Sequence, residues 1–127
     1  MKIALIAHDG KKAEMVSFVM KRLDFFNRKD VDIVTTGTTG QFMTDAGVKG
    51  IQKVLSGPLG GDAQIASMVS EGKLSSVIFF RDPLGKHAHE VDVSMLMRLC
   101  DVHNVPLATN YKACLLYTSP SPRDPVS

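Results

Sequence analysis

Two Gly-rich turns carry residue types that could bind and transform a phosphate ester. The first turn, residues 35–40, is Thr-Thr-Gly-Thr-Thr-Gly. Glycines let the backbone approach a ligand closely, and N–H groups at a helix N-terminus favour an anion. Threonine hydroxyls add neutral donors that suit a phosphate monoester, but the same threonines could simply cap a helix. The sequence leaves both interpretations of this turn open.

The second turn, residues 56–62, is Ser-Gly-Pro-Leu-Gly-Gly-Asp. Asp62 could be an N-cap residue, because aspartate is among the preferred helix caps. It could instead be a general base, which must lie within about 3 Å of the carbon-bound proton that it removes. The two glycines before Asp62 would leave room for a substrate to approach.

The segment from His8 to Lys12 offers polar groups after an apolar run. Lys12 could neutralise a phosphate as a compact charge, or it could be an ordinary solvated lysine. His8 could hydrogen-bond a polar substrate or its neighbour Asp9.

A second histidine-containing segment, residues 81–89, follows another apolar run. His89 could polarise a carbonyl oxygen or transfer protons, because imidazole titrates near neutral pH. His87 and His89 raise the alternative of a zinc site. Their i, i+2 spacing without a partner cysteine is not a specific zinc pattern, so we expect no metal.

Hydrophobic patterning predicts the elements that position these residues. Apolar runs predict strands at residues 3–7, 31–35, 51–55, 77–80 and 105–108, and helical periodicity predicts helices at 11–27, 38–46, 63–71 and 91–103. Alternating strands and helices indicate a doubly wound, mostly parallel α/β sheet with helices on both faces, in a single domain. Every polar cluster above follows a strand, and the carboxyl ends of parallel strands are where open α/β sheets bind ligands.

Bulk composition limits the function classes. The 127 residues are 44% hydrophobic and 22% charged, with a formal net charge of +2, which suits one folded domain and favours neither nucleic acid nor a membrane as a partner. No apolar run is long enough to span a bilayer or to form a secretory signal. Cys100 and Cys114 form no disulfide framework, so we expect a cytoplasmic protein.

The C-terminal segment has a different composition. Three of the six prolines lie in residues 118–127, and the segment resembles translated adapter or vector sequence. We therefore expect a C-terminally truncated domain over residues 1–112 and a non-native disordered tail over residues 113–127.

Six motifs together carry a family resemblance. This chain resembles the methylglyoxal synthases in the order and spacing of six runs: AHDGKK (7–12), TTGTTG (35–40), SGPLGGD (56–62), FFRDPL (79–84), HEVDV (89–93) and VPLATN (105–110). The resemblance extends from Met1 to about Asn110. It implies a lyase in a bypass of glycolysis that eliminates phosphate from dihydroxyacetone phosphate through an enediolate, with no metal or organic cofactor.

The resemblance also implies roles for individual residues. Asp62 matches the catalytic carboxylate, and His89 matches the histidine that contacts the carbonyl and enediol oxygens. The implied substrate-binding residues are His8, Lys12, Thr36, Gly37, Thr38, Thr39, Ser56 and Gly57, and the implied supporting residues are Asp9, Asp82 and Asp92. The family forms homohexamers with phosphate-linked regulation, and its members continue after Asn110 with a final helix that the tail would replace here.

Two other interpretations compete with an enzyme. The same fold occurs as a non-catalytic domain that binds small effectors in larger synthetases, but the presence of both Asp62 and His89 favours catalysis. The third interpretation is an incomplete and partly unfolded fragment, which size-exclusion chromatography and circular dichroism would distinguish from the other two.

Overall fold

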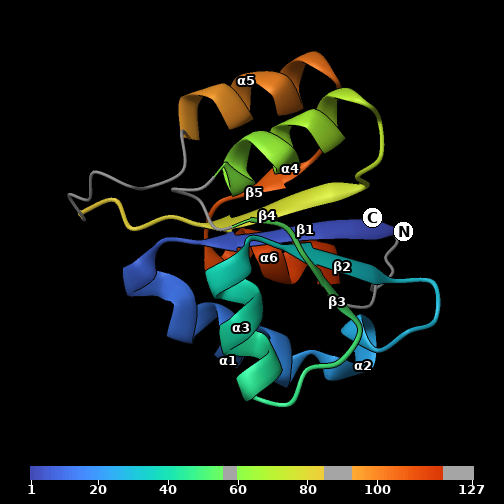
Figure 1. Ribbon diagram of the computed structural model, residues 1–127, viewed down its shortest axis with the longest axis vertical. Helices are drawn as coiled ribbons and strands as arrows, with labels where there is room; N and C mark the ends of the chain where they lie inside the picture. The colour runs from blue at the N-terminus through green and yellow to red at the C-terminus, as the bar shows by residue number, and fades with distance from the viewer. Residues whose placement is uncertain (56–59, 85–92, 119–127) are drawn as a thin grey trace.

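Apolar runs of the sequence form five parallel strands. A computed structural model describes residues 1–55, 60–84 and 93–118. The strands are β1 (Lys2–Ala7), β2 (Asp32–Thr35), β3 (Ile51–Lys53), β4 (Ser76–Phe80) and β5 (Leu107–Ala108). Their order in the sheet is β3-β2-β1-β4-β5 (Figure 1). The predicted α/β fold with a parallel sheet is therefore confirmed.

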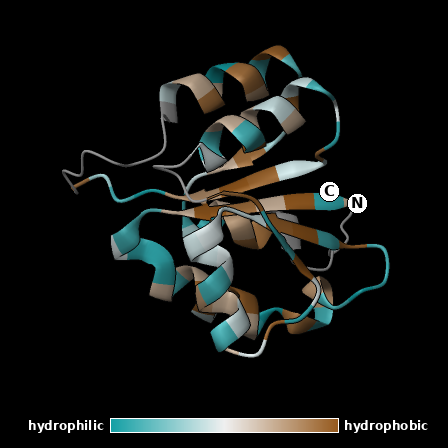
Figure 2. Cartoon of the chain, viewed as in Figure 1, coloured by the Kyte–Doolittle hydropathy of each residue, from teal (hydrophilic) through white to brown (hydrophobic). Residues whose placement is uncertain are grey.

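Helices cover both faces of the sheet. They are the short 3-10 helix η1 (Asp9–Lys11) and the α-helices α1 (Lys12–Lys21), α2 (Leu23–Phe26), α3 (Gly37–Asp45), α4 (Gly61–Ser70), α5 (Val93–Val102) and α6 (Tyr111–Thr118). In Figure 1, α4 and α5 lie above the sheet, whereas α1, α2, α3 and α6 lie below it. This arrangement buries the strands on both sides, which explains their continuous hydrophobicity in Figure 2.

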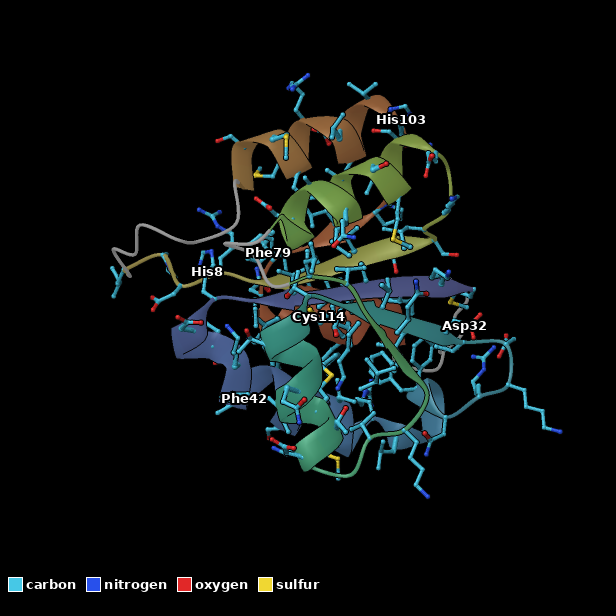
Figure 3. All side chains as sticks on the ribbon, viewed as in Figure 1. His8, Asp32, Phe42, Phe79, His103 and Cys114 are labelled. Carbon is cyan, nitrogen blue, oxygen red and sulfur yellow. The ribbon has the colours of Figure 1, made fainter. Side chains whose placement is uncertain are left out.

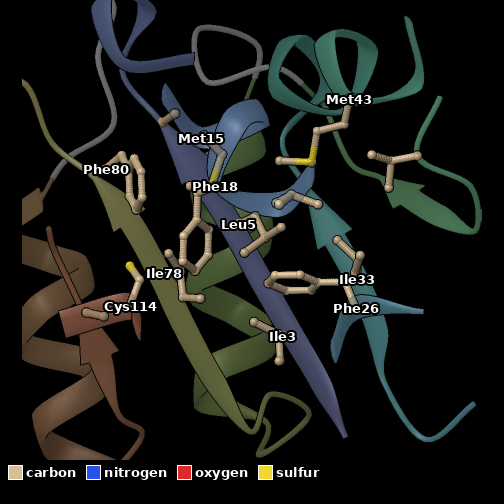
Figure 4. Packing of buried hydrophobic residues seen from close by; sticks show 14 of the residues in the cluster. Ile3, Leu5, Met15, Phe18, Phe26, Ile33, Met43, Ile78, Phe80 and Cys114 are labelled. Atoms are coloured by element: carbon tan, nitrogen blue, oxygen red, sulfur yellow. The ribbon is translucent and has the colours of Figure 1, made fainter. Parts of the chain in front are cut away.

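Successive side chains of β1 belong alternately to two hydrophobic clusters, one on each face of the sheet. Leu5 of β1 packs with Phe18 and Met43 in the cluster below the sheet (Figure 4). Ile6, the next residue of β1, packs with Ile65 in the cluster above it. Each such side chain is less than 2% exposed, and its burial contributes about 1.5–3 kcal/mol.

The order in which strands are added to the sheet reverses at β1, and this reversal determines where the polar loops lie. The chain moves outward from β1 through β2 to β3, and then returns to the other side of β1 with β4 and β5. The register aligns Leu5 with Thr35 and Ala7 with Phe80, so the carboxyl ends of the three central strands lie at one edge. A crevice at such a topological switch point is the usual ligand site of this architecture.

The predicted helix over residues 11–27 is wrong in its length. Helix α1 ends at Lys21, because Arg22 has φ −124° and ψ 30°, and α2 follows as a separate turn. Phe18 is fully buried, whereas Met20 on the same helix is 40% exposed.

The predicted disordered tail is wrong for residues 113–118. These residues complete helix α6, whose Cys114 is 0% exposed. Tyr111, the first residue of α6, makes an edge contact with the ring of Phe18, with centroids 5.5 Å apart. A helix after Asn110 is therefore present, and the expected boundary at residue 112 falls inside it. Residues 119–127 lie outside the described part of the chain.

Candidate active site

His8 connects the loops that follow β1 and β4. Its backbone N–H donates to the carbonyl of Phe80 over 3.2 Å, and its Nδ1 accepts from the N–H of Asp82 over 2.9 Å. The imidazole is 6% exposed and meets the ring of Phe79 edge-on, with centroids 5.0 Å apart (Figure 3). Since Nδ1 is an acceptor, a neutral imidazole at this position carries its proton on Nε2.

Lys12 is the second polar group at the end of β1. Its Nζ donates to Asp9 Oδ1 over 2.5 Å and to the carbonyl of Ala7 over 3.2 Å. Lysine is rarely buried unless it is paired, yet Lys12 is only 7% exposed, whereas the Asp9 side chain is 77% exposed. The interpretation of Lys12 as an ordinary solvated lysine is therefore wrong, since the ammonium is held at the carboxyl edge of the sheet.

The turn of residues 36–39 begins α3. Thr36 precedes the helix with an extended backbone, and its hydroxyl contacts the hydroxyl of Thr39 over 3.3 Å instead of a backbone N–H. Thr36 and Thr39 are buried, and Thr38 is exposed. The structure therefore contradicts the interpretation that these threonine hydroxyls merely cap the helix. An N-terminus without a side-chain cap retains N–H donors that suit an anion.

Asp62 belongs to the first turn of α4, above the sheet. The residue that precedes the helix is Gly60, whose φ of 103° is strained for any residue with a side chain. Asp62 is thus the second residue of the helix, and the alternative interpretation of Asp62 as the N-cap is wrong. Its Oδ1 accepts from the N–H of Ala63 over 2.9 Å, and the residue is partly exposed.

Leu55 links the threonine turn to the helix that carries Asp62. Its carbonyl accepts from the N–H of Gly37 over 3.3 Å, and its own N–H donates to Gln64 Oε1 over 2.7 Å. Gly37 begins α3 below the sheet, whereas Gln64 belongs to α4 above it. The first turns of the two helices are therefore connected through one residue.

Asp82 lies in the loop that follows β4, next to His8. Its Oδ1 accepts from the N–H of Leu84 over 3.2 Å. A Cβ atom on Gly10 would lie 2.8 Å from Asp82 Oδ2, so the absence of a side chain at Gly10 lets the two loops meet. Together with the bond between Asp82 and His8, this close approach holds the loops after β1 and β4 against each other.

Several expected site residues lie outside the described part of the chain. They are Ser56, Gly57, His89 and Asp92, together with His87 of the zinc alternative. Their roles stay predictions. Within residues 1–55, 60–84 and 93–118, no cluster of three or more His, Cys, Asp or Glu side chains could hold a metal ion.

A separate hollow of about 320 Å³ opens at the carboxyl ends of β4 and β5, on the side of α1 and α6. Its lining residues are Lys11, Glu14, Phe80, Arg81, Pro83, Thr109, Asn110 and Tyr111. None of the expected substrate-binding residues in the described ranges lines it. Asn110 caps α6 there, since its Oδ1 accepts from the N–H of Ala113 over 2.9 Å.

Comparison with known proteins identifies the family. A family model described as an MGS-like domain matches residues 15–109. The chain is 49% identical over 117 residues to a methylglyoxal synthase of Carboxydothermus hydrogenoformans, covering 92% of this chain and 95% of that protein. It is 52% identical over 111 residues to a methylglyoxal synthase of Borrelia garinii subsp. bavariensis, covering 87% of this chain and 86% of that protein. The chain belongs to the methylglyoxal synthase family.

A solved methylglyoxal synthase has the same fold. The crystal structure of the enzyme from Elizabethkingia anophelis matches with a TM-score of 0.88 and 40% identity, covering 95% of this chain and 78% of that chain. The resemblance carried by the six motifs is therefore confirmed, and the chain is a methylglyoxal synthase-type enzyme. No helix in the described ranges is long and apolar enough to cross a membrane.

Proposed function

We propose that this chain eliminates phosphate from dihydroxyacetone phosphate and releases methylglyoxal. The identity to proteins named methylglyoxal synthase over most of the chain carries this proposal. The arrangement at the carboxyl edge supports it, because a buried ammonium, a helix N-terminus without a side-chain cap and a carboxylate all lie in the first turns of helices that follow neighbouring strands.

Phosphate binding is the first task of the site. The N-terminus of α3 offers backbone N–H groups and the dipole of a nine-residue helix, and Thr38 presents an exposed hydroxyl there. Lys12 supplies the positive charge, which Asp9 and the carbonyl of Ala7 hold in position. Ser56 and Gly57 complete this cradle in the proposal.

Asp62 is the proposed base. It removes a proton from the hydroxymethyl carbon of the substrate, and the electrons of that C–H bond form an enediolate with the carbonyl carbon. Negative charge then grows on the former carbonyl oxygen, so donors aimed at that oxygen accelerate the step. His89 donates to this oxygen, and His8 can add its Nε2–H because Asp82 occupies Nδ1. Asp92 has a supporting role.

The orientation of the phosphate ester decides the fate of the enediolate. If the C–O bond to phosphate lies perpendicular to the enediolate plane, the π electrons can expel phosphate as that bond breaks. The hydroxyl of the former hydroxymethyl carbon loses its proton and becomes the aldehyde oxygen, and the enolate that remains gains a proton on the carbon that lost phosphate, which gives methylglyoxal. A site that held the bond in the plane would favour isomerisation instead. The threonine turn therefore controls the reaction outcome in addition to affinity.

Assembly and location follow the resemblance. We propose a cytoplasmic homohexamer whose activity responds to inorganic phosphate. Exposed apolar side chains offer surface for such assembly, among them Val102 at 66% exposure and Leu116 at 82%. Light scattering after size-exclusion chromatography tests the hexamer, since a monomer of 13.8 kDa would elute far later.

A turnover assay tests the proposed function. Purified chain is incubated with dihydroxyacetone phosphate, and methylglyoxal is followed as it forms, with Asp62→Asn as the matched control. We expect the unaltered chain to release methylglyoxal. The reaction of the variant should be slower by roughly 10² fold or more. Binding of the substrate without any turnover would instead indicate the effector-binding alternative.

A further inference from the structure

Helix α3 lies unusually close to strand β2 at one point. A Cβ atom on Gly40 would lie 2.3 Å from Thr35 Oγ1 and 2.7 Å from Cγ of Lys53. Ordinary contacts of a Cβ atom begin near 3.4 Å. A side chain at position 40 therefore fits only if the side chains of Thr35 and Lys53, the helix or the strands shift.

The hydroxyl of Thr35 is part of the same contact. Thr35 is 0% exposed, and its Oγ1 has no hydrogen-bond partner among the described residues. A buried hydroxyl without a partner is uncommon and destabilising. The side chain points below the sheet, since Leu5 pairs with Thr35 in register and Ile33, two residues earlier on β2, belongs to the lower cluster. Thr35 therefore supports the face of α3 that packs against the sheet.

Gly40 is coupled to the turn that precedes it. Its N–H donates to the carbonyl of Thr36 over 2.9 Å, which closes the first turn of α3. A displacement of Gly40 by roughly 1 Å would carry the whole turn of residues 36–39 with it, because helical turns are stiff. Misplacement of a binding group by about 1 Å can cost roughly 10² fold in function.

We propose that Gly40 and Thr35 form a spacer that positions the phosphate-binding turn, with neither residue contacting the substrate. This inference rests on the proposed function, since it assigns phosphate to the turn of residues 36–39. The contact sets the distance between the α3 N-terminus and the sheet. Substitution at Gly40 therefore weakens phosphate affinity by roughly 10 to 10² fold, and raises KM for the substrate more than it lowers kcat.

Three variants test the spacer. Gly40→Ala introduces the Cβ atom, and Thr35→Ala/Gly40→Ala removes Oγ1, the nearest atom that this Cβ would meet, so that only the Lys53 side chain must still shift. Met43→Ala is the matched control, because Met43 lies on the same helix and is 0% exposed, but its loss leaves a cavity without pushing the turn. Titration calorimetry gives the affinity for inorganic phosphate, steady-state kinetics give KM and kcat, and urea denaturation gives stability.

The spacer predicts that Gly40→Ala loses phosphate affinity, that the double variant regains at least part of it, and that Met43→Ala loses stability but keeps its affinity. Equal affinity in Gly40→Ala and the unaltered chain overturns the spacer and leaves the proposed function intact. No phosphate binding by the unaltered chain overturns the proposed function and the spacer with it.

A fourth variant covers the case in which Gly40→Ala does not fold. Thr35→Val keeps the shape of the side chain and replaces the hydroxyl by a methyl group. If Thr35 only supports α3, this variant folds and binds phosphate as the unaltered chain does. A tenfold loss of phosphate affinity in Thr35→Val would show that the hydroxyl serves the ligand, and would overturn the spacer.

Discussion

The backbone N–H of Asp82 donates to Nδ1 of His8 over 2.9 Å, which joins two loops 74 residues apart in the sequence. The bond lies where the strand order reverses, between the ends of β1 and β4. It gives the site a fixed wall, and it leaves Nε2 of a neutral His8 as a donor.

His8 variants should separate the structural role of this bond from the role in turnover. His8→Leu removes the acceptor for the Asp82 N–H and should cost about 1–3 kcal/mol of stability. His8→Asn can place its amide oxygen near the former Nδ1 and should cost less, but it lacks the Nε2 donor. Both should turn over more slowly. Urea denaturation checks the order, and equal stability of the two variants would show that the bond does not stabilise the loops.

Asp62→Asn should abolish turnover and leave the fold intact. The amide oxygen can still accept from the N–H of Ala63, so only the favourable charge near the α4 N-terminus is lost, worth about 0.3–1 kcal/mol. Loss of the base should slow the reaction by roughly 10² to 10⁴ fold. Near-normal turnover measured under saturating substrate would mean that Asp62 only serves the helix.

Substitutions of His89 and Lys12 should affect turnover and phosphate affinity separately. His89→Gln keeps a donor of similar reach, yet turnover should fall by roughly 10² to 10³ fold, as when one electrophilic donor is removed. Its affinity for phosphate should stay almost unchanged. Lys12→Ala should lose phosphate affinity first, because a charged hydrogen bond contributes about 1.5–3 kcal/mol. Kinetics and calorimetry on both variants check this, and the reverse pattern would mean that the two roles are exchanged.

Cys114 should make stability depend on pH in alkaline solution. Burial, together with the charge of Glu14, raises the pKa of this thiol from 9.0 to about 12. In the unfolded chain the thiol ionises near its ordinary value, so the stabilisation is complete below that value and is lost as the pH rises toward 12. The unfolding free energy should fall by about 1.4 kcal/mol per pH unit in that window.

The matched control for this effect is Cys114→Val. It keeps Cys100, whose pKa is also raised by burial, so the difference between the two proteins isolates Cys114. Urea denaturation between pH 8 and pH 10 measures that difference. Parallel pH profiles of the two proteins would show that Cys114 does not titrate differently on folding.

The sequence predicts the strands well because buried strands of a parallel sheet are continuously apolar. Residues 3–7 and 77–80 match β1 and β4 within a residue. The end of α1 at Lys21 was not predictable, since the apolar pattern continues through Leu23 and the break depends on the backbone of Arg22. Proline-rich composition near the C-terminus likewise led to the wrong prediction of a disordered tail over residues 113–118 of α6, whose Cys114 is buried through tertiary packing.

The sequence predicts candidate site residues but not their geometry. The Gly-rich turns and strand ends identified Thr36, Lys12 and Asp62 as candidates, because these residue types suit a phosphate ester at a sheet edge. Local preference gave the wrong start for α4, since the left-handed backbone of Gly60 lets the helix begin one residue before Asp62. The contact between Gly40 and Thr35 depends on the distance between a helix and a strand, which no local pattern encodes.

The most direct test of the account follows the fate of the enediolate. Dihydroxyacetone phosphate and the purified chain are combined, and ³¹P and ¹H NMR spectra are recorded in the same tube as the substrate disappears. We expect methylglyoxal and inorganic phosphate to appear in equal amounts, with no glyceraldehyde 3-phosphate. Glyceraldehyde 3-phosphate as the main product, or unchanged substrate with a well-folded chain, would contradict the account.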